Sequence, residues 1–337
     1  MRCVWLHVRV LRFARLGLAS SLLAAAVCSC GAQPSDLQAN VRVAAGRPGA
    51  GAAAGAVAAT PAPAPKPRAG DERIDELLAA VAAGREGDGL PARIETALRR
   101  DDDAVRATLA FIRGDKATKM VIDALAASGT PAAQDALCSL ARDGRLPRHI
   151  RAEAVSSLGL VRGPTVATMT EVGELIRTRE PDLAAPALFL AGTVARAGRV
   201  DHPVHAAAIE KIVIAESARA RGTDELLDAL AALGNLGSVG VLPRLRTALA
   251  SGDSRVRAAA ARALRLVPDA EADRLLVTTL RRDHDPTVRA AAIFAAGFRK
   301  LDPLVGALSD TAQSDPTDYV RAGAVTLLAR NRQSAPQ

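Results

Sequence analysis

Residues 253–264 read DSRVRAAAARAL, residues 285–297 read DPTVRAAAIFAAG, and residues 318–329 read DYVRAGAVTLLA. Each segment contains a Val-Arg pair followed by small residues, and the three valines of these pairs are spaced 32 residues apart. Weaker copies of the pair occur upstream, at residues 105–107 and 150–152. A repeat of this length, rich in helix-forming residues, is typical of proteins built from stacked helix pairs.

Each repeat is predicted to contain a first helix, a turn with an aspartate, and the Val-Arg helix. The leucines predicted to end the first helices are Leu249, Leu280 and Leu308, and the aspartates predicted to cap the second ones are Asp253, Asp285 and Asp315. An aspartate at this position accepts hydrogen bonds from the free N–H groups of a helix start. Thr130-Pro131 and Asp302-Pro303 are the same start signal elsewhere in the chain.

The composition favours an all-α fold. The chain is 49% apolar and only 2% aromatic, and no stretch alternates between apolar and polar residues as a strand would. The Val-Arg helices are apolar on more than one face, as expected of helices packed between neighbouring repeats. We therefore predict an α-α superhelix, a solenoid of seven or eight helix pairs, over residues 71–337.

The repeat resembles HEAT repeats over residues 71–332, and the armadillo-like helical class in general. A narrower resemblance covers residues 116–300, where KATKMVIDALAASGTPAAQDALCSLARDG and TDELLDALAALGNLG are similar to the helical domain of the vitellogenin and microsomal triglyceride transfer family. In that family the domain is a curved double layer of helices that wraps lipid-carrying β-sheets. The resemblance implies the same curved helical architecture here, but this chain has no candidate for those sheets, and no functional residue is carried over.

The first 29 residues are predicted to be a signal peptide. Four arginines precede an apolar run from Leu16 to Val27, and this run is too short to span a bilayer as a helix. The run ends at Val27-Cys28-Ser29-Cys30-Gly31, which resembles a bacterial lipobox. Cys30 fits lipidation better than Cys28, because a small residue precedes it, and the alternative is ordinary cleavage that yields an unanchored periplasmic protein.

Residues 30–70 are predicted to be a disordered tether. This segment consists mainly of alanine, glycine and proline, with almost no large apolar residue. Such a segment cannot bury enough surface to offset the entropy of ordering it. The sequence therefore predicts a lipid-anchored domain on the periplasmic face of a bacterial membrane, most simply the outer membrane.

The net charge of +8 is concentrated before the helical region. The first 29 residues contribute four arginines and residues 31–70 contribute +3, which leaves +1 for residues 71–337. A nucleic-acid-binding domain would need concentrated positive charge, so no nucleic acid is expected as a partner.

We find no sequence motif for catalysis, a metal or a cofactor. His202 and His205, next to Asp201, form the one histidine cluster. The cluster could bind a metal ion or form a polar turn between helices. We favour the turn, because Pro203 disfavours a helical conformation at His202. His149 and His284 are expected in exposed turns. Cys138 is expected to be a small buried apolar residue, because no histidine lies near it to activate a thiolate.

The repeated arginines are Arg106, Arg151, Arg257, Arg289 and Arg321, and they have two interpretations. They could line one ridge that binds acidic peptides or phosphates, or each could form an ion pair with a capping aspartate of a neighbouring repeat, such as Asp253 or Asp285. We favour the second interpretation.

The acidic run 101–103 is expected to be a helix start. Phe294 and Phe298, one helical turn apart, are expected in the core.

The sequence therefore favours a non-catalytic scaffold for protein–protein interaction, whose partner it does not identify. Two alternatives remain open. The family resemblance suggests a lipid-binding or lipid-transfer accessory protein, and an enzyme would require a site that is not visible in the linear sequence.

Overall fold

The computed structural model describes residues 72–85, 87, 89–116 and 119–334. The predicted signal peptide, the predicted tether and the lipidation candidate Cys30 lie outside the described residues. Within them the chain forms sixteen α-helices, α3 to α18, and no β-strand. The eight resulting helix pairs confirm the predicted all-α superhelix.

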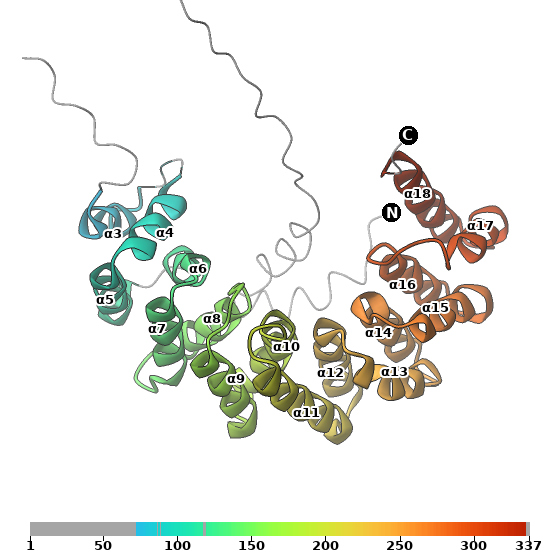
Figure 1. Ribbon diagram of the computed structural model, residues 1–337, viewed down its shortest axis with the longest axis horizontal. Coiled ribbons are helices and arrows are strands. Elements are labelled where there is room, and N and C mark those ends of the chain that lie inside the picture. The colour runs from blue at the N-terminus through green and yellow to red at the C-terminus, as the bar shows by residue number, and fades with distance from the viewer. Residues whose placement is uncertain (1–71, 86, 88, 117–118, 335–337) are drawn as a thin grey trace, which may run out of the picture. The chain divides into compact units, whose positions relative to one another are not determined.

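The helices are arranged in two layers, which Figure 1 shows for the unit Arg73–Gln337. The odd-numbered layer consists of α3 (Ile74–Ala82), α5 (Asp102–Phe111), α7 (Pro131–Arg142), α9 (Val166–Thr178), α11 (Pro203–Arg219), α13 (Leu242–Leu249), α15 (Ala270–Arg282) and α17 (Val305–Ser314). The even-numbered layer consists of α4 (Leu90–Arg100), α6 (Lys119–Ser128), α8 (Arg148–Leu158), α10 (Pro181–Ala197), α12 (Thr223–Leu236), α14 (Ser254–Ala263), α16 (Pro286–Ala296) and α18 (Asp318–Ser334). Each even-numbered helix packs against the next even-numbered one, and this layer lies on the inner side of the curve.

Three short turns complete the described chain: the π-helical turn η1 (Ile112–Lys116) and the 3₁₀ turns η2 (Val239–Val241) and η3 (Leu264–Leu266). The buried apolar side chains form one continuous cluster that runs from Leu77 to Ala324. Alanines make up much of it in α14 and α16, where they allow neighbouring helices to approach closely. A single pair could not bury both of its faces, so stacking provides the core.

The predicted helix starts are largely confirmed. Asp253 and Asp285 accept hydrogen bonds from the backbone N–H groups of Arg255 and Thr287, at 2.9 and 2.8 Å. Thr130 caps α7, and Asp101 caps α5 in the acidic run. The start signal at Asp302-Pro303 was wrong: α17 begins at Val305 after a separate turn, and its N-cap residue is Leu304.

The predicted first-helix ends are confirmed at Leu249 only. The helix α15 continues to Arg282, past Leu280, and α17 continues to Ser314, past Leu308. Arg281 and Arg282 are good helix formers that continue α15, and in α17 the helix continues because Thr311, one turn after Leu308, is buried against the core. His149, expected in a turn, lies in the first turn of α8 and is exposed.

Candidate functional site

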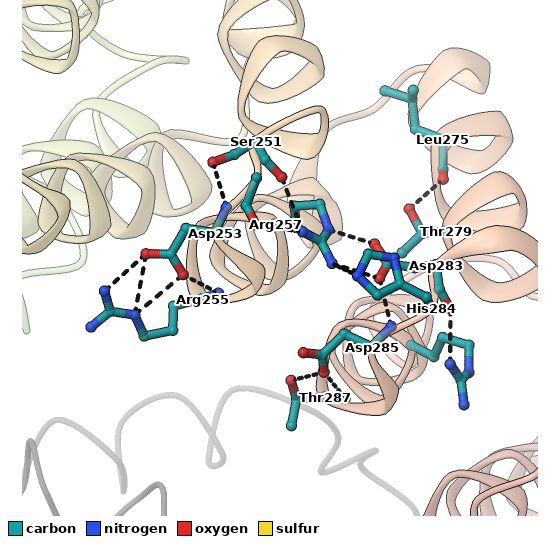
Figure 2. Close-up of polar contacts among 12 residues, drawn as sticks. Ser251, Asp253, Arg255, Arg257, Leu275, Thr279, Asp283, His284, Asp285 and Thr287 are labelled. Atoms are coloured by element: carbon teal, nitrogen blue, oxygen red, sulfur yellow. Dashed lines mark hydrogen bonds and ion pairs between the residues drawn. The ribbon is translucent and has the colours of Figure 1, made fainter.

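The repeated arginine of α14 joins two helix pairs. Arg257 donates from Nε and Nη2 to the two carboxylate oxygens of Asp283, at 2.8 and 3.0 Å. Its Nη1 donates to the carbonyl oxygen of Ser251 in its own turn, at 3.0 Å. Figure 2 shows the guanidinium between these two groups, next to His284. Because the Arg257 side chain is only 7% exposed, it is not available to a ligand.

The arginine of α16 repeats this arrangement. Arg289 pairs with both oxygens of Asp315, at 2.6 and 2.9 Å, and donates to the carbonyl oxygen of Asp283 at 2.8 Å. Upstream, Arg151 joins Glu180 to the carbonyl oxygen of Ala141. We refer to Arg151, Arg257 and Arg289 as the arginine ladder. The ladder links repeats, which agrees with the favoured interpretation of the repeated arginines.

One partner of the ladder, Asp315, is an aspartate predicted to cap a helix, whereas Asp283 is not. The N-cap residues Asp253 and Asp285 are turned toward their own helix starts, whereas the ladder uses Asp283, two residues before a cap. Asp315, the third aspartate predicted to cap a helix, lies three residues before the start of α18; it accepts from the N–H of Thr317 at 2.9 Å and also pairs with Arg289. Arg106 and Arg321 stay outside the ladder, because Arg106 pairs with Asp103 and Arg321 with Asp318, each within its own helix.

The two clustered histidines lie at the start of α11. His202 is the N-cap residue, with φ −133° and ψ 59°, and His205 lies in the first helical turn. Their ring centroids are 6.5 Å apart and the rings are nearly perpendicular. In the described part of the chain no group of three His, Cys, Asp or Glu side chains is placed to hold a metal ion. The structure thus adds no third ligand to this pair.

Cys138 lies in α7, half-buried against the core. Burial, with a smaller contribution from the Glu171 carboxylate, raises the pKa of its thiol to about 12. The thiol is therefore protonated at neutral pH, and the environment does not favour a nucleophile. This agrees with the structural interpretation of the residue.

Two open grooves lie on the odd-numbered layer. The larger, of about 850 Å³, is lined by charged side chains of the α7–α9 region, which include Arg113, Arg142, Asp143, Arg145 and Glu171. The lining is mutually neutralised: Arg142 donates to Glu171 at 2.6 Å, and Arg113 pairs with Asp143 at 3.3 Å. The smaller groove, of about 540 Å³, lies between α3 and α5 and is lined mainly by Leu78, Phe111 and alanines.

The aromatic pair at the C-terminal end of α16, with Phe294 in the helix and Phe298 in the turn after it, is exposed, contrary to its expected place in the core. Phe294 and Phe298 are 49% and 39% exposed, and their ring centroids are 5.1 Å apart. The buried sides of α16 are already filled by smaller residues, which include Val288, Ala292 and Ala295. Since α16 packs against α14, α15 and α18, the face that exposes Phe294 is turned away from the odd-numbered layer.

These features define a class of protein: an α-helical superhelix of stacked helix pairs, with buried ion pairs between repeats and an exposed aromatic pair on the inner layer. The vitellogenin TPR domain model matches residues 97–328. The chain belongs to the vitellogenin TPR domain family. No curated protein sequence matches it.

Three solved structures are similar to this chain, and the first of them shares its fold. A structure of lipovitellin, described for its lipid–protein interactions, is 15% identical with a TM-score of 0.53 and covers 77% of this chain and 33% of that one. This chain thus spans about a third of that protein's length. Human deoxyhypusine hydroxylase in complex with glycerol is 18% identical with a TM-score of 0.33, covering 77% and 96%. The CpcE–CpcF complex of phycocyanin lyase from Nostoc sp. PCC7120 is 17% identical with a TM-score of 0.40, covering 84% and 95%.

Proposed function

We propose that the helical unit is a non-catalytic scaffold that binds a protein partner through the inner face of α16. The observation that carries the proposal is the exposed pair Phe294 and Phe298. Aromatic side chains are enriched among the residues that dominate binding energy at protein interfaces. In a chain with few aromatic residues, two adjacent phenylalanines at the surface are the best candidates for such an anchor.

Replacing both rings is expected to abolish binding of the partner. The full-length Phe294→Ala/Phe298→Ala chain and the unchanged chain would each be immobilised and exposed to cell extract, and recovered proteins and lipids identified together by mass spectrometry. Truncation of a central aromatic anchor costs about 2 kcal/mol or more, roughly a thirty-fold loss of affinity. A protein recovered with the unchanged chain should therefore be lost with the variant.

The matched control is Val200→Ala/Val204→Ala, which truncates two apolar side chains that are 88% and 77% exposed near the start of α11. This control should retain the partner. Equal recovery with the phenylalanine variant, or a defined lipid recovered without any protein, would argue against the scaffold.

The second candidate is a lipid-binding accessory, which membership in the vitellogenin TPR domain family favours. The apolar groove between α3 and α5 supports it, because its volume of about 540 Å³ lies within the range of small-molecule pockets. The same experiment separates the candidates, since a lipid retained by the phenylalanine variant and the unchanged chain alike would select this one.

The proposal also includes a lipid anchor at Cys30 and a location on the periplasmic face of a membrane. Its support is the lipobox-like segment and the short apolar run before it. Among the described residues no helix is long and apolar enough to cross a membrane.

A further inference from the structure

Three arginines meet at the C-terminal end of α12. Arg196, in the last turn of α10, donates from Nε to the carbonyl oxygen of Asn235 at 3.1 Å. Arg199 donates from Nη2 to the carbonyl oxygen of Leu236 at 2.8 Å. Arg265, in η3, donates from Nη2 to the side-chain oxygen of Asn235. We call Arg196, Arg199 and Arg265 the arginine cluster.

The arginine cluster differs from the arginine ladder in its partners. Ladder arginines such as Arg257 and Arg289 each hold a carboxylate at 2.6 to 2.8 Å. In the part of the chain that the structure describes, no carboxylate forms an ion pair with any member of the cluster; each donates to neutral oxygens only. Three positive charges are thus gathered without an acid to offset them.

The surroundings of the cluster are closely packed. Asn235 is fixed by a hydrogen bond from its side-chain nitrogen to the carbonyl oxygen of Phe189, at 3.1 Å. At Gly234 a Cβ atom would lie 2.5 Å from Nη1 of Arg265 and 2.8 Å from Cα of Ala263, so only glycine leaves room for this guanidinium. The arginine is therefore held in place by the contact of α12 with α14.

The electrostatics of the cluster favour an added negative charge. Burial, with a smaller contribution from the positive charge of Arg196, lowers the pKa of Arg265 to about 10. Burial and then Arg199 lower the pKa of Arg196. Both groups remain cations at neutral pH, and the negative end of the α12 dipole offsets their charge only in part.

We propose that the arginine cluster binds a phosphate-type oxyanion, either free phosphate or the phosphate of a lipid headgroup. Nη1 and Nη2 of Arg196, and Nε and Nη1 of Arg199, make no hydrogen bond to the described residues and are available as donors. Guanidinium groups bind phosphate oxygens in pairs, with charge-assisted hydrogen bonds. This site is independent of the aromatic pair and of the partner proposed there.

The test measures binding of inorganic phosphate by isothermal titration calorimetry. All chains carry Cys28→Ala and Cys30→Ala, so that N-terminal acylation does not contribute. Loss of one charge-assisted hydrogen bond lowers the affinity for a ligand by about ten-fold. The variant Arg196→Gln/Arg199→Gln should therefore bind phosphate at least about ten-fold more weakly. Arg265 is left unchanged because it supports α12. The matched control, Arg177→Gln/Arg281→Gln, removes the same charge from two exposed, paired arginines and should bind as the unchanged chain does.

A second arm distinguishes the sources of phosphate. The same chains are sedimented with vesicles of phosphatidylcholine alone and of phosphatidylcholine with phosphatidic acid. Selective cosedimentation with phosphatidic acid, lost in Arg196→Gln/Arg199→Gln, assigns the site to a lipid headgroup, whereas calorimetric binding without cosedimentation assigns it to free phosphate. The proposal is overturned if neither probe binds, or if the cluster variant and the control bind equally.

Discussion

Replacing Asp315 by asparagine is expected to destabilise the helical unit by about 3 kcal/mol. Asp315 and Arg289 are almost fully buried, with side chains 4% and 8% exposed, and they pair at 2.6 Å. Asparagine keeps an oxygen for the N–H of Thr317 but leaves the guanidinium without a counter-charge. The unfolding free energy from urea denaturation of the full-length chain measures the effect.

The matched control is Asp310→Asn, which breaks the pair of Asp310 with Arg281 at 2.9 Å. Both side chains are more than half exposed, so a change of at most about 1 kcal/mol is expected. Equal effects at the two aspartates would show that burial of the ladder pair does not matter to stability.

The same pair predicts a pH dependence. The Arg289 guanidinium, opposed in part by burial, holds the pKa of Asp315 below its ordinary value of 3.8. The folded state therefore binds this proton less readily than the unfolded state, and the pair's contribution is present above the ordinary pKa. It is lost as the pH falls through the lowered pKa. The stability difference between the unchanged chain and Asp315→Asn should accordingly shrink below about pH 4.

Replacing Gly192 by alanine is expected to destabilise the unit by about 1–3 kcal/mol, although alanine is the better helix former. At this position in α10 an added Cβ would collide with the carbonyl oxygen of Ala232 and would lie 2.8 Å from the backbone nitrogen of Leu236. These atoms belong to the backbone of α12 and cannot move aside. The two helices would have to separate, which thermal unfolding followed by circular dichroism would detect.

Gly323→Ala in α18 is the matched control. There the added Cβ would lie 3.7 Å from the nearest side-chain carbon of Ile293, an ordinary contact. Alanine should therefore stabilise this helix by about 0.5–1 kcal/mol. A Gly192→Ala chain that is also stabilised would mean that α10 and α12 are not in close contact.

Much of the fold could be predicted from local signals. The 32-residue spacing of the Val-Arg pairs and the caps at Asp253 and Asp285 reflect interactions within one repeat, so they are visible in the linear sequence. The end of a first helix was less predictable. Beyond Leu280 the two arginines are exposed, whereas beyond Leu308 the buried Thr311 extends the packed face of α17, and a leucine alone does not mark the last turn of a helix.

The functional surfaces were harder to predict, because they depend on contacts between repeats. The sequence indicated that Phe294 was apolar and helical, but exposure depends on whether another helix covers it. The arginine cluster has no regular spacing, and its members stand out only because no acid from a neighbouring helix reaches them. Pairing across repeats is a property of the tertiary structure, which a single sequence does not show.

A double-mutant cycle on Arg257 and Asp283 tests most directly whether the repeated arginines bind one helix pair to the next. Unfolding free energies would be measured for the full-length chain, Arg257→Ala, Asp283→Ala and the double variant. The short distance of 2.8 Å between two side chains that are 7% and 11% exposed predicts a coupling energy of about 1–3 kcal/mol. A coupling energy within about 0.3 kcal/mol of zero would contradict the ladder, because it would mean that the pair does not stabilise the contact between the two helix pairs.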